Sequence, residues 1–245
     1  MKASRGAHAR RALKALIVRA FAPAGSVVTV RTKERQIVLT FDDGPDPVGT
    51  EQVLSALAAD GSQATFFVLI TRTRRYPTLL REVSAEGHEI GLHGLDHRPL
   101  TAFTYREAEA RTSAAKSELE QTLGLPVRWF RPPYGRQTPA SWLAVRQCGL
   151  EPVMWGPTLW DWRDIDQGAR LEKARLGAAP GAIVLGHDSF AGLSDGAEPA
   201  LEPVVDRYDL VRRVISEYAN LGLAVTSLEQ ALKSGTPVRL ASFRG

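Results

Sequence analysis

The sequence predicts an α/β domain, a (β/α) barrel of about seven parallel strands, which follows a basic arm. From Gln36 onward, short apolar runs alternate with stretches that are typical of helices. The apolar runs are continuous, which is typical of strands buried on both faces. Strands that alternate with helices are joined by right-handed crossovers and therefore run parallel. This many units in about 210 residues favours a barrel over an open sheet.

The expected elements follow one another without an internal repeat or an interdomain linker. The strands are the apolar runs at 36–41, 64–70, 88–92, 127–130, 150–154, 181–185 and 222–226. The helices lie at about 49–60, 77–86, 104–123, 138–148, 168–177 and 203–220, with a last one near 227–233. Segment 186–203 is rich in Gly, Ser, Asp and Pro and is therefore expected to be a loop. In barrels of parallel strands, the loops after the strands carry the chemistry.

Charge divides the chain into two parts, an arm (1–35) and a domain (36–245). The 245 residues carry a formal net charge of +4 and are 44% hydrophobic, which suits one large core. The arm holds nine Lys and Arg side chains and one acidic one, whereas the domain is mildly acidic. A domain without a basic surface argues against nucleic acid as the main partner.

The arm predicts an amphipathic helix within residues 7–21, because its apolar residues recur at helical spacing. Three interpretations remain open: a helix docked on the domain, a basic helix on an anionic membrane surface, and a signal peptide. The last is least favoured because Lys14 and Arg19 interrupt the apolar stretch. We expect a cytoplasmic monomer, peripheral at the inner membrane surface under the second interpretation, with secretion or the cell envelope as the alternative. The single cysteine, Cys148, excludes an intramolecular disulfide and fits a reducing compartment.

Polar residues suited to catalysis follow the expected strands. They are Asp42 and Asp43, His93 and His97, Arg131, Asp161 with Trp162, and His187. Because the carboxyl ends of parallel strands share one face, these side chains should converge there. Any one of these motifs alone would more often be structural, since "DDG" favours a turn and a His pair is often incidental. Their joint occurrence at successive strand ends favours a site.

The pair His93 and His97 suggests metal binding, since a helical turn would point both rings the same way. Two imidazoles and one carboxylate suit Zn²⁺ and leave positions for water and substrate. A bound cation would also relieve the repulsion between Asp42 and Asp43. We therefore expect one aspartate to bind the cation and its neighbour to act as a base.

Five motifs occur in an order that resembles the polysaccharide deacetylase family, also called the NodB-homology domain or carbohydrate esterase family 4. They are "TFDDGP" (40–45), "HGLDH" (93–97), "RPPYG" (131–135), "WDW" (160–162) and "LGHD" (185–188). The resemblance covers roughly residues 36–233. It implies a distorted (β/α) barrel, a divalent metal and the hydrolytic removal of an acyl group, usually N-acetyl from an amino sugar.

The resemblance also implies roles for individual residues. The metal ligands would be Asp43, His93 and His97, with zinc as the metal and cobalt, nickel or manganese as alternatives. Asp42 would be the general base for the attacking water, and Arg131 would keep it ionised. His187 would be the general acid that protonates the leaving amine, oriented by Asp161. Trp162 and Leu185 would enclose the acetyl methyl, and the N–H of Tyr134, which follows Pro133, would stabilise the oxyanion.

Two positions depart from the family pattern. Gly94 stands where a Ser or Thr is usual, and Thr158 stands where an acid is usual. The missing hydroxyl could loosen the metal ligands, and Asp96 could compensate or compete for the metal.

The expected function is a metal-dependent hydrolase that removes N-acetyl groups from N-acetylhexosamine residues of a polymer, an oligosaccharide or a lipid-linked sugar. The alternatives are an O-acetyl esterase or a small amide or N-formyl hydrolase. A non-catalytic glycan-binding module is least favoured because Asp42 and His187 are present.

Overall fold

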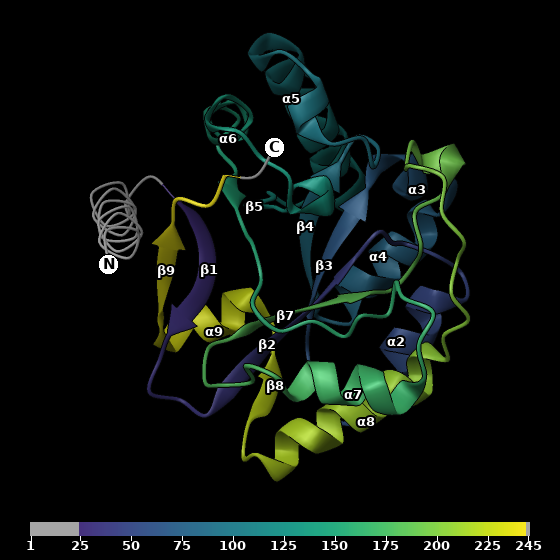
Figure 1. Ribbon diagram of the computed structural model, residues 1–245. Coiled ribbons are helices and arrows are strands. Elements are labelled where there is room, and N and C mark those ends of the chain that lie inside the picture. The colour runs from purple at the N-terminus through teal and green to yellow at the C-terminus, as the bar shows by residue number, and fades with distance from the viewer. Residues whose placement is uncertain (1–24, 244–245) are drawn as a thin grey trace, which may run out of the picture.

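The computed structural model describes residues 25–243 and shows a curved parallel sheet surrounded by helices (Figure 1). The sheet has seven strands in the order β6-β5-β4-β3-β2-β7, with β8 paired to the first half of β2. They are β2 (Gln36–Asp42), β3 (Thr65–Leu69), β4 (Glu89–Gly94), β5 (Trp129–Phe130), β6 (Glu151–Pro152), β7 (Ile183–His187) and β8 (Ala224–Thr226). Every ladder among them is parallel, which confirms the predicted fold class.

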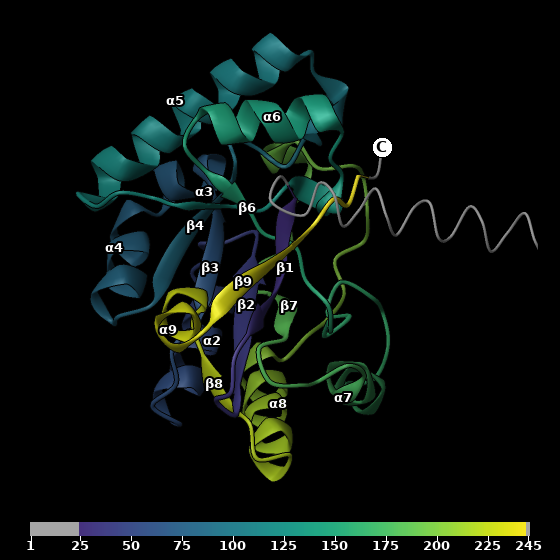
Figure 2. The same cartoon turned by 90° about the vertical axis from the view of Figure 1, so that its left-hand side faces the viewer.

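The helices lie close to their expected positions. They are α2 (Gly49–Ala58), α3 (Ile70–Arg75), α4 (Pro77–Ala85), α5 (Tyr105–Leu123), α6 (Pro139–Gln147), α7 (Gln167–Arg175), α8 (Arg207–Asn220) and α9 (Leu228–Ser234). Helix α5 packs against α6, and α8 packs between α2 and α7 (Figure 2). Helix α3 was not expected, because its first residue, Ile70, continues the apolar run of β3. At α5, Thr104 and Glu107 form a capping box and Gly124 ends the helix in a left-handed conformation.

A small antiparallel pair, β1 (Ser26–Arg31) and β9 (Thr236–Leu240), stands beside the parallel sheet (Figure 1). Within residues 25–243 no ladder joins β6 to β7, the two edges of the sheet. Strand β1 fills this gap: Val27 O accepts from Met154 N–H at 2.7 Å, and Val30 N–H donates to Gly181 O at 2.8 Å. Strand β1 was not expected from the sequence, because it falls in the range assigned to the arm. The helix expected at 7–21 lies outside the described residues.

The central strands are buried on both faces, as their continuous apolar runs predicted. In β2, Ile37, Leu39 and Phe41 are buried in the main core, and Val38 is buried in a second cluster on the opposite face. Burying one such side chain contributes about 1.5–3 kcal/mol to stability. The strand is therefore rigid up to its carboxyl end, where Asp42 closes it.

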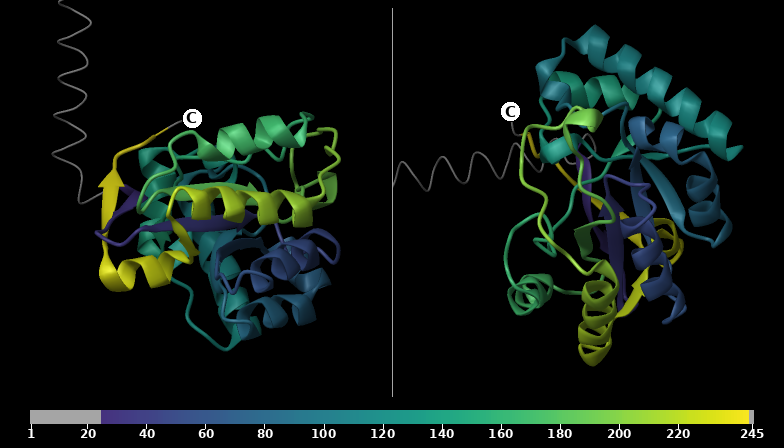
Figure 3. Two further views of the ribbon diagram at one scale, coloured as in Figure 1. Left: turned by 90° about the horizontal axis from the view of Figure 1, so that it is seen from below. Right: turned by 90° about the vertical axis from the view of Figure 1, so that its right-hand side faces the viewer.

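Three short 3₁₀ turns occupy the loops after the sheet: η2 (Leu100–Ala102), η3 (Pro133–Gly135) and η4 (Leu193–Asp195). They follow β4, β5 and β7, so all three lie beyond carboxyl ends of parallel strands. The longest of these loops runs from β7 through η4 to α8 along the outside of the molecule (Figure 3, right). Among residues 25–243, no helix combines the length and the apolar character needed to cross a bilayer.

Candidate active site

Three buried side chains meet at the carboxyl end of the sheet: Asp43, His93 and His97. Each offers one ligand atom, and these atoms lie within 4.8 Å of one another. Asp43 Oδ1 is 3.4 Å from His93 Nε2 and 3.2 Å from His97 Nε2. The three residues that the sequence proposed as metal ligands are therefore close enough to share one ion.

The two histidines do not share a helical turn, contrary to expectation. His93 belongs to β4, and His97 lies in the loop that follows. His93 Nδ1 is 2.8 Å from Arg131 O, and because a carbonyl oxygen only accepts, Nδ1 carries the proton. His93 Nε2 is therefore free to bind a metal. Burial lowers the pKa of His93 to about 4, which keeps the ring neutral, as a ligand must be.

The Asp43 carboxylate has one oxygen held and one oxygen open. Oδ2 accepts the N–H of Ala191 at 3.1 Å, whereas Oδ1 is buried and has no hydrogen-bond partner within the described residues. Burial alone would raise the pKa of Asp43, but His97, followed by His187 and His93, holds it well below its usual range. An ionised oxygen that faces two imidazoles without a donor fits a divalent cation, and this mixed N and O donor set suits Zn²⁺.

Asp42 and Arg131 form a buried ion pair beside this group. Arg131 Nη1 donates to Asp42 Oδ1 at 2.7 Å and to Thr40 Oγ1 at 2.7 Å. The guanidinium is fully buried and lies 4.1 Å from the centre of the Phe67 ring. Asp42 Oδ2 takes no part in the ion pair and lies 4.0 Å from His93 Nε2. One carboxylate oxygen is thus anchored, and the other faces His93, one of the candidate metal ligands.

His187 lies opposite Asp42 in the ladder between β7 and β2. Its Nδ1 is 2.8 Å from Asp161 Oδ1, and its backbone N–H donates to Asp161 Oδ2 at 2.6 Å. Burial by itself lowers the pKa of His187, but the Asp161 carboxylate outweighs it and the pKa rises to about 9. The ring is therefore positively charged at neutral pH, with a proton on each nitrogen. Asp161 binds Nδ1, so the proton on Nε2 is free to be donated.

A cavity of about 320 Å³ joins these groups. Asp42, Asp43 and the three histidines line it, and Tyr134, Trp162 and Leu185 form part of its wall. Arg131 and Asp161 are buried behind residues of the lining, and Pro133 is buried next to Tyr134. Phe190 also lines the cavity, whereas the Trp160 ring is not part of the lining and lies under Lys173 and Arg163.

Sequence reasoning missed several residues of the wall, including Trp155, Ala197, Glu198 and Ala200. The last three belong to segment 186–203, whose composition had identified it as a loop on the chemical face. Trp155 carries no such signal in the sequence, since a tryptophan packs in a core as readily as it lines a binding site. Tyr134 has a left-handed backbone (φ 58°), its ring meets His97 edge-on at 4.3 Å, and its hydroxyl accepts the N–H of Glu198 at 2.9 Å.

The structure accounts for the departures in the second and fourth motifs. Gly94 has φ +147°, and a Cβ there would lie 2.7 Å from Asp96 O, so a Ser or Thr would be strained. The Asp96 side chain is bound by Arg98 at 2.6 Å and Arg111 at 2.7 Å and is not one of the three grouped ligands. It therefore does not compete for a metal. Thr158 Oγ1 accepts the N–H of Trp160 at 3.3 Å and supports the turn before Asp161.

Relatives of this chain are found among named deacetylases. The family described as polysaccharide deacetylase matches residues 29–153. The chain is 32% identical over 184 residues to the peptidoglycan-N-acetylmuramic acid deacetylase PdaC of Bacillus subtilis, which covers 75% of this chain but 39% of that protein. It is 34% identical over 165 residues to a chitooligosaccharide deacetylase of Azorhizobium caulinodans, which covers 67% of this chain and 79% of that protein.

Solved structures show the same arrangement of elements. PdaC of Bacillus subtilis matches with a TM-score of 0.70 and 27% identity, over 82% of this chain and 92% of that one. A carbohydrate esterase family 4 pseudoenzyme from Bacillus anthracis matches with a TM-score of 0.73 over 87% of this chain and 70% of that one, and at 19% identity it shows the fold alone. Catalysis must therefore be argued from the site rather than from the fold. The motif order, the family match and the relatives together place this chain in the polysaccharide deacetylase family.

Proposed function

We propose that this protein is a metal-dependent hydrolase that removes N-acetyl groups from N-acetylhexosamine residues of a glycan. One observation carries the proposal: a three-residue metal group lies in one cavity with a carboxylate, Asp42, and a protonated imidazole, His187. Amide hydrolysis requires a base for the water and an acid for the leaving amine. The names of the relatives, which include deacetylases of peptidoglycan and of chitooligosaccharides, support this class of substrate.

The metal would be held by Asp43, His93 and His97, with zinc favoured and cobalt, nickel or manganese as alternatives. When bound there, such an ion polarises the amide carbonyl and makes water more acidic. Within the chain, Asp42 takes the proton of the attacking water through Oδ2, since Arg131 anchors Oδ1. His187 gives its Nε2 proton to the leaving nitrogen, since Asp161 holds Nδ1.

The acid and the base must hold opposite protonation states at the same pH. The buried Arg131 compensates the charge of Asp42, and Asp161 compensates the charge of His187. Each catalytic group therefore has its own buried counter-charge on the side away from the cavity. The N–H of Tyr134 would stabilise the oxyanion, and Trp162 with Leu185 would enclose the acetyl methyl, because both side chains line the cavity.

Measuring acetate release from N-acetylated glycans of increasing length tests the proposal. Release should require added Zn²⁺ after chelation, and Asp42→Asn should lower kcat by about 10²–10⁴-fold, as expected for loss of a general base. Parallel measurement of formate, ammonia and O-linked acetate identifies any other hydrolase activity. Absence of acetate release across the panel in the zinc-loaded protein, or equal release by Asp42→Asn, would refute the proposal.

A further inference from the structure

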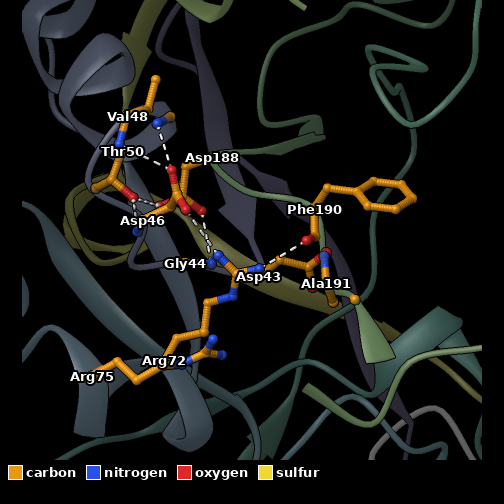
Figure 4. Close-up of polar contacts among 12 residues, drawn as sticks. Asp43, Gly44, Asp46, Val48, Thr50, Arg72, Arg75, Asp188, Phe190 and Ala191 are labelled. Atoms are coloured by element: carbon orange, nitrogen blue, oxygen red, sulfur yellow. Dashed lines mark hydrogen bonds and ion pairs between the residues drawn. The ribbon is translucent and has the colours of Figure 1, made fainter. Parts of the chain in front are cut away.

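A buried arginine that the mechanism does not use, Arg72 of α3, lies beside the loop that carries Asp43 (Figure 4). Its side chain is 9% exposed, and its guanidinium binds two different loops. Nη1 donates to Asp46 Oδ2 at 3.1 Å in the loop after β2. Nη2 donates to Phe190 O at 2.8 Å and to Asp195 Oδ2 at 2.9 Å, both in the loop after β7. One side chain thus joins the loop that carries Asp43 to the loop after β7, which contacts Asp43 through Ala191.

The contact with Phe190 acts on Asp43 through a single peptide group. The carbonyl that Arg72 holds and the N–H of Ala191 belong to the same peptide plane, and that N–H donates to Asp43 Oδ2 at 3.1 Å (Figure 4). Fixing the carbonyl side of this plane fixes the direction of the N–H on its other side. The orientation of the Asp43 carboxylate, and with it the open oxygen Oδ1, therefore depends on where Arg72 holds the loop.

The contact with Asp195 acts on a second ligand. The carboxylate of Asp195 is fully buried. It also forms an ion pair with Arg75 and accepts a hydrogen bond from the N–H of Gly192. Its backbone carbonyl accepts the N–H of His97 at 2.7 Å. Because the side chain of Asp195 is anchored by Arg72, its carbonyl holds the backbone of His97 in place.

Burial of this ion pair is not explained by stability, because desolvation of two charges offsets much of their attraction. An arginine fork does give a fixed geometry, since its donors lie in one plane and are spaced for a carboxylate. We propose that Arg72 is a positioning residue for the metal centre, which orients Asp43 through the Phe190–Ala191 peptide and His97 through Asp195. The inference rests on the metal site of the proposed function and extends it to residues that touch neither metal nor substrate.

The dissociation constant of Zn²⁺, measured by competition with a chromophoric chelator, tests the inference without an activity assay. Arg72→Met keeps the length of the side chain and removes its donors. Zinc should bind about 10–100-fold more weakly to this variant, as is typical when a partner that orients a ligand is lost. Arg74→Ala is the matched control on the same helix, because Arg74 is 56% exposed and pairs with Glu118. This control should bind zinc as the wild type does.

Arg72→Lys serves as the second variant, should Arg72→Met fail to fold. Its ammonium keeps the charge but is too compact to reach all three acceptors, so zinc binding should again weaken. A folded Arg72→Met or Arg72→Lys with the wild-type zinc Kd and only a lower unfolding midpoint would show a purely structural role and overturn the inference. If the wild type binds zinc and releases no acetate, the proposed function fails while the positioning role is still measured.

Discussion

Two carboxylates lie at opposite ends of the same parallel sheet, the buried Asp43 after β2 and the half-buried Glu89 at the start of β4. Both oxygens of Glu89 accept hydrogen bonds. Oε1 accepts from Trp129 Nε1. Oε2 accepts from Thr65 Oγ1 at 2.6 Å and from the N–H of Glu229 at 3.0 Å. Asp43 differs because Oδ1 has no donor within the described residues and faces imidazoles. The carboxylate oxygen without a donor therefore distinguishes the candidate ligand, Asp43, from the structural carboxylate, Glu89.

The two carboxylates also differ in the direction of their pKa. Burial raises the pKa of Glu89, and its hydrogen-bond donors, which are all neutral, oppose this only in part. At Asp43 burial acts in the same direction, but the three histidines outweigh it and lower the pKa. The amino-terminal end of the sheet thus tolerates one charge by surrounding it with neutral donors. The carboxyl-terminal end gathers groups that stabilise negative charge, as a cation site requires.

The largest expected effect comes from Asp43→Asn. The amide has no charge and a single acceptor oxygen, so the variant loses the ionised oxygen that faces His93 and His97. Zinc should bind more weakly by more than the ~10–100-fold typical of losing an outer partner, and acetate release should fall with it. Chelator competition measures the zinc Kd, and release is assayed at the same zinc concentration.

Glu89→Gln is the matched change at the other end of the sheet. The NH₂ group of the glutamine would face a group that now donates to Glu89, so two donors would meet and one hydrogen bond would be lost. We therefore expect the free energy of unfolding, measured in urea, to fall by about 1–3 kcal/mol. Because the pKa of Glu89 is raised above 4.5 in the folded state, its contribution to stability weakens as pH rises above that value. Glutamine removes this dependence. If folded Glu89→Gln lost zinc binding, the assignment of Glu89 to stability and of Asp43 to metal binding would be wrong.

Two of the three candidate metal ligands, Asp43 and His93, could be placed from the sequence because each lies in or directly after a strand, whereas His97 lies in the loop after β4. Asp43 follows the last residue of β2 and His93 lies in β4, so the position of each is set by a strand that the apolar pattern already revealed. His187 ends β7 for the same reason. The parallel sheet brings these strand ends together, so order along the chain and strand position are enough to place the site.

Other parts depended on contacts between distant segments, which local sequence does not encode. Arg72 stands in "TRTRR", where nothing separates it from Arg74 and Arg75, yet Arg72 is buried and Arg74 is exposed. Strand β1 pairs with β9, near the other end of the chain, and its neighbourhood was dominated by the basic charges of the arm. Trp155 reaches the cavity only because the chain after β6 passes it.

An intermediate effect is expected for Asp161→Asn, which tests charge coupling at the functional end. The pKa of His187 is raised to about 9 chiefly because Asp161 outweighs the effect of burial. Removing this charge should lower the pKa, so the proton on Nε2 would be lost at lower pH. The alkaline limb of kcat/KM for acetate release should move down by about 1–3 pH units. Identical alkaline limbs in the two proteins would show that Asp161 does not set the protonation of His187.

The smallest effect is expected at Gly94, whose φ is +147° and whose Cβ would lie 2.7 Å from Asp96 O. Gly94→Ser should cost about 1–3 kcal/mol of stability and should not strengthen zinc binding, because the loop must shift to accept the side chain. Gly61→Ser is the control: its φ is +70°, but a Cβ would meet nothing within 4 Å, so it measures backbone strain alone.

A tighter zinc Kd in Gly94→Ser would contradict this expectation. It would mean that the loop between His93 and His97 has a second arrangement in which a hydroxyl braces the ligands. The carboxyl-terminal end of the sheet would then be adaptable, whereas Glu89 at the other end is fixed by donors from three separate elements, β3, β5 and α9. The opposite result would be unchanged or weaker zinc binding together with a larger loss of stability than in Gly61→Ser. It would show that the loop between His93 and His97 cannot shift to accept a side chain at Gly94, so this loop is held as firmly as Glu89.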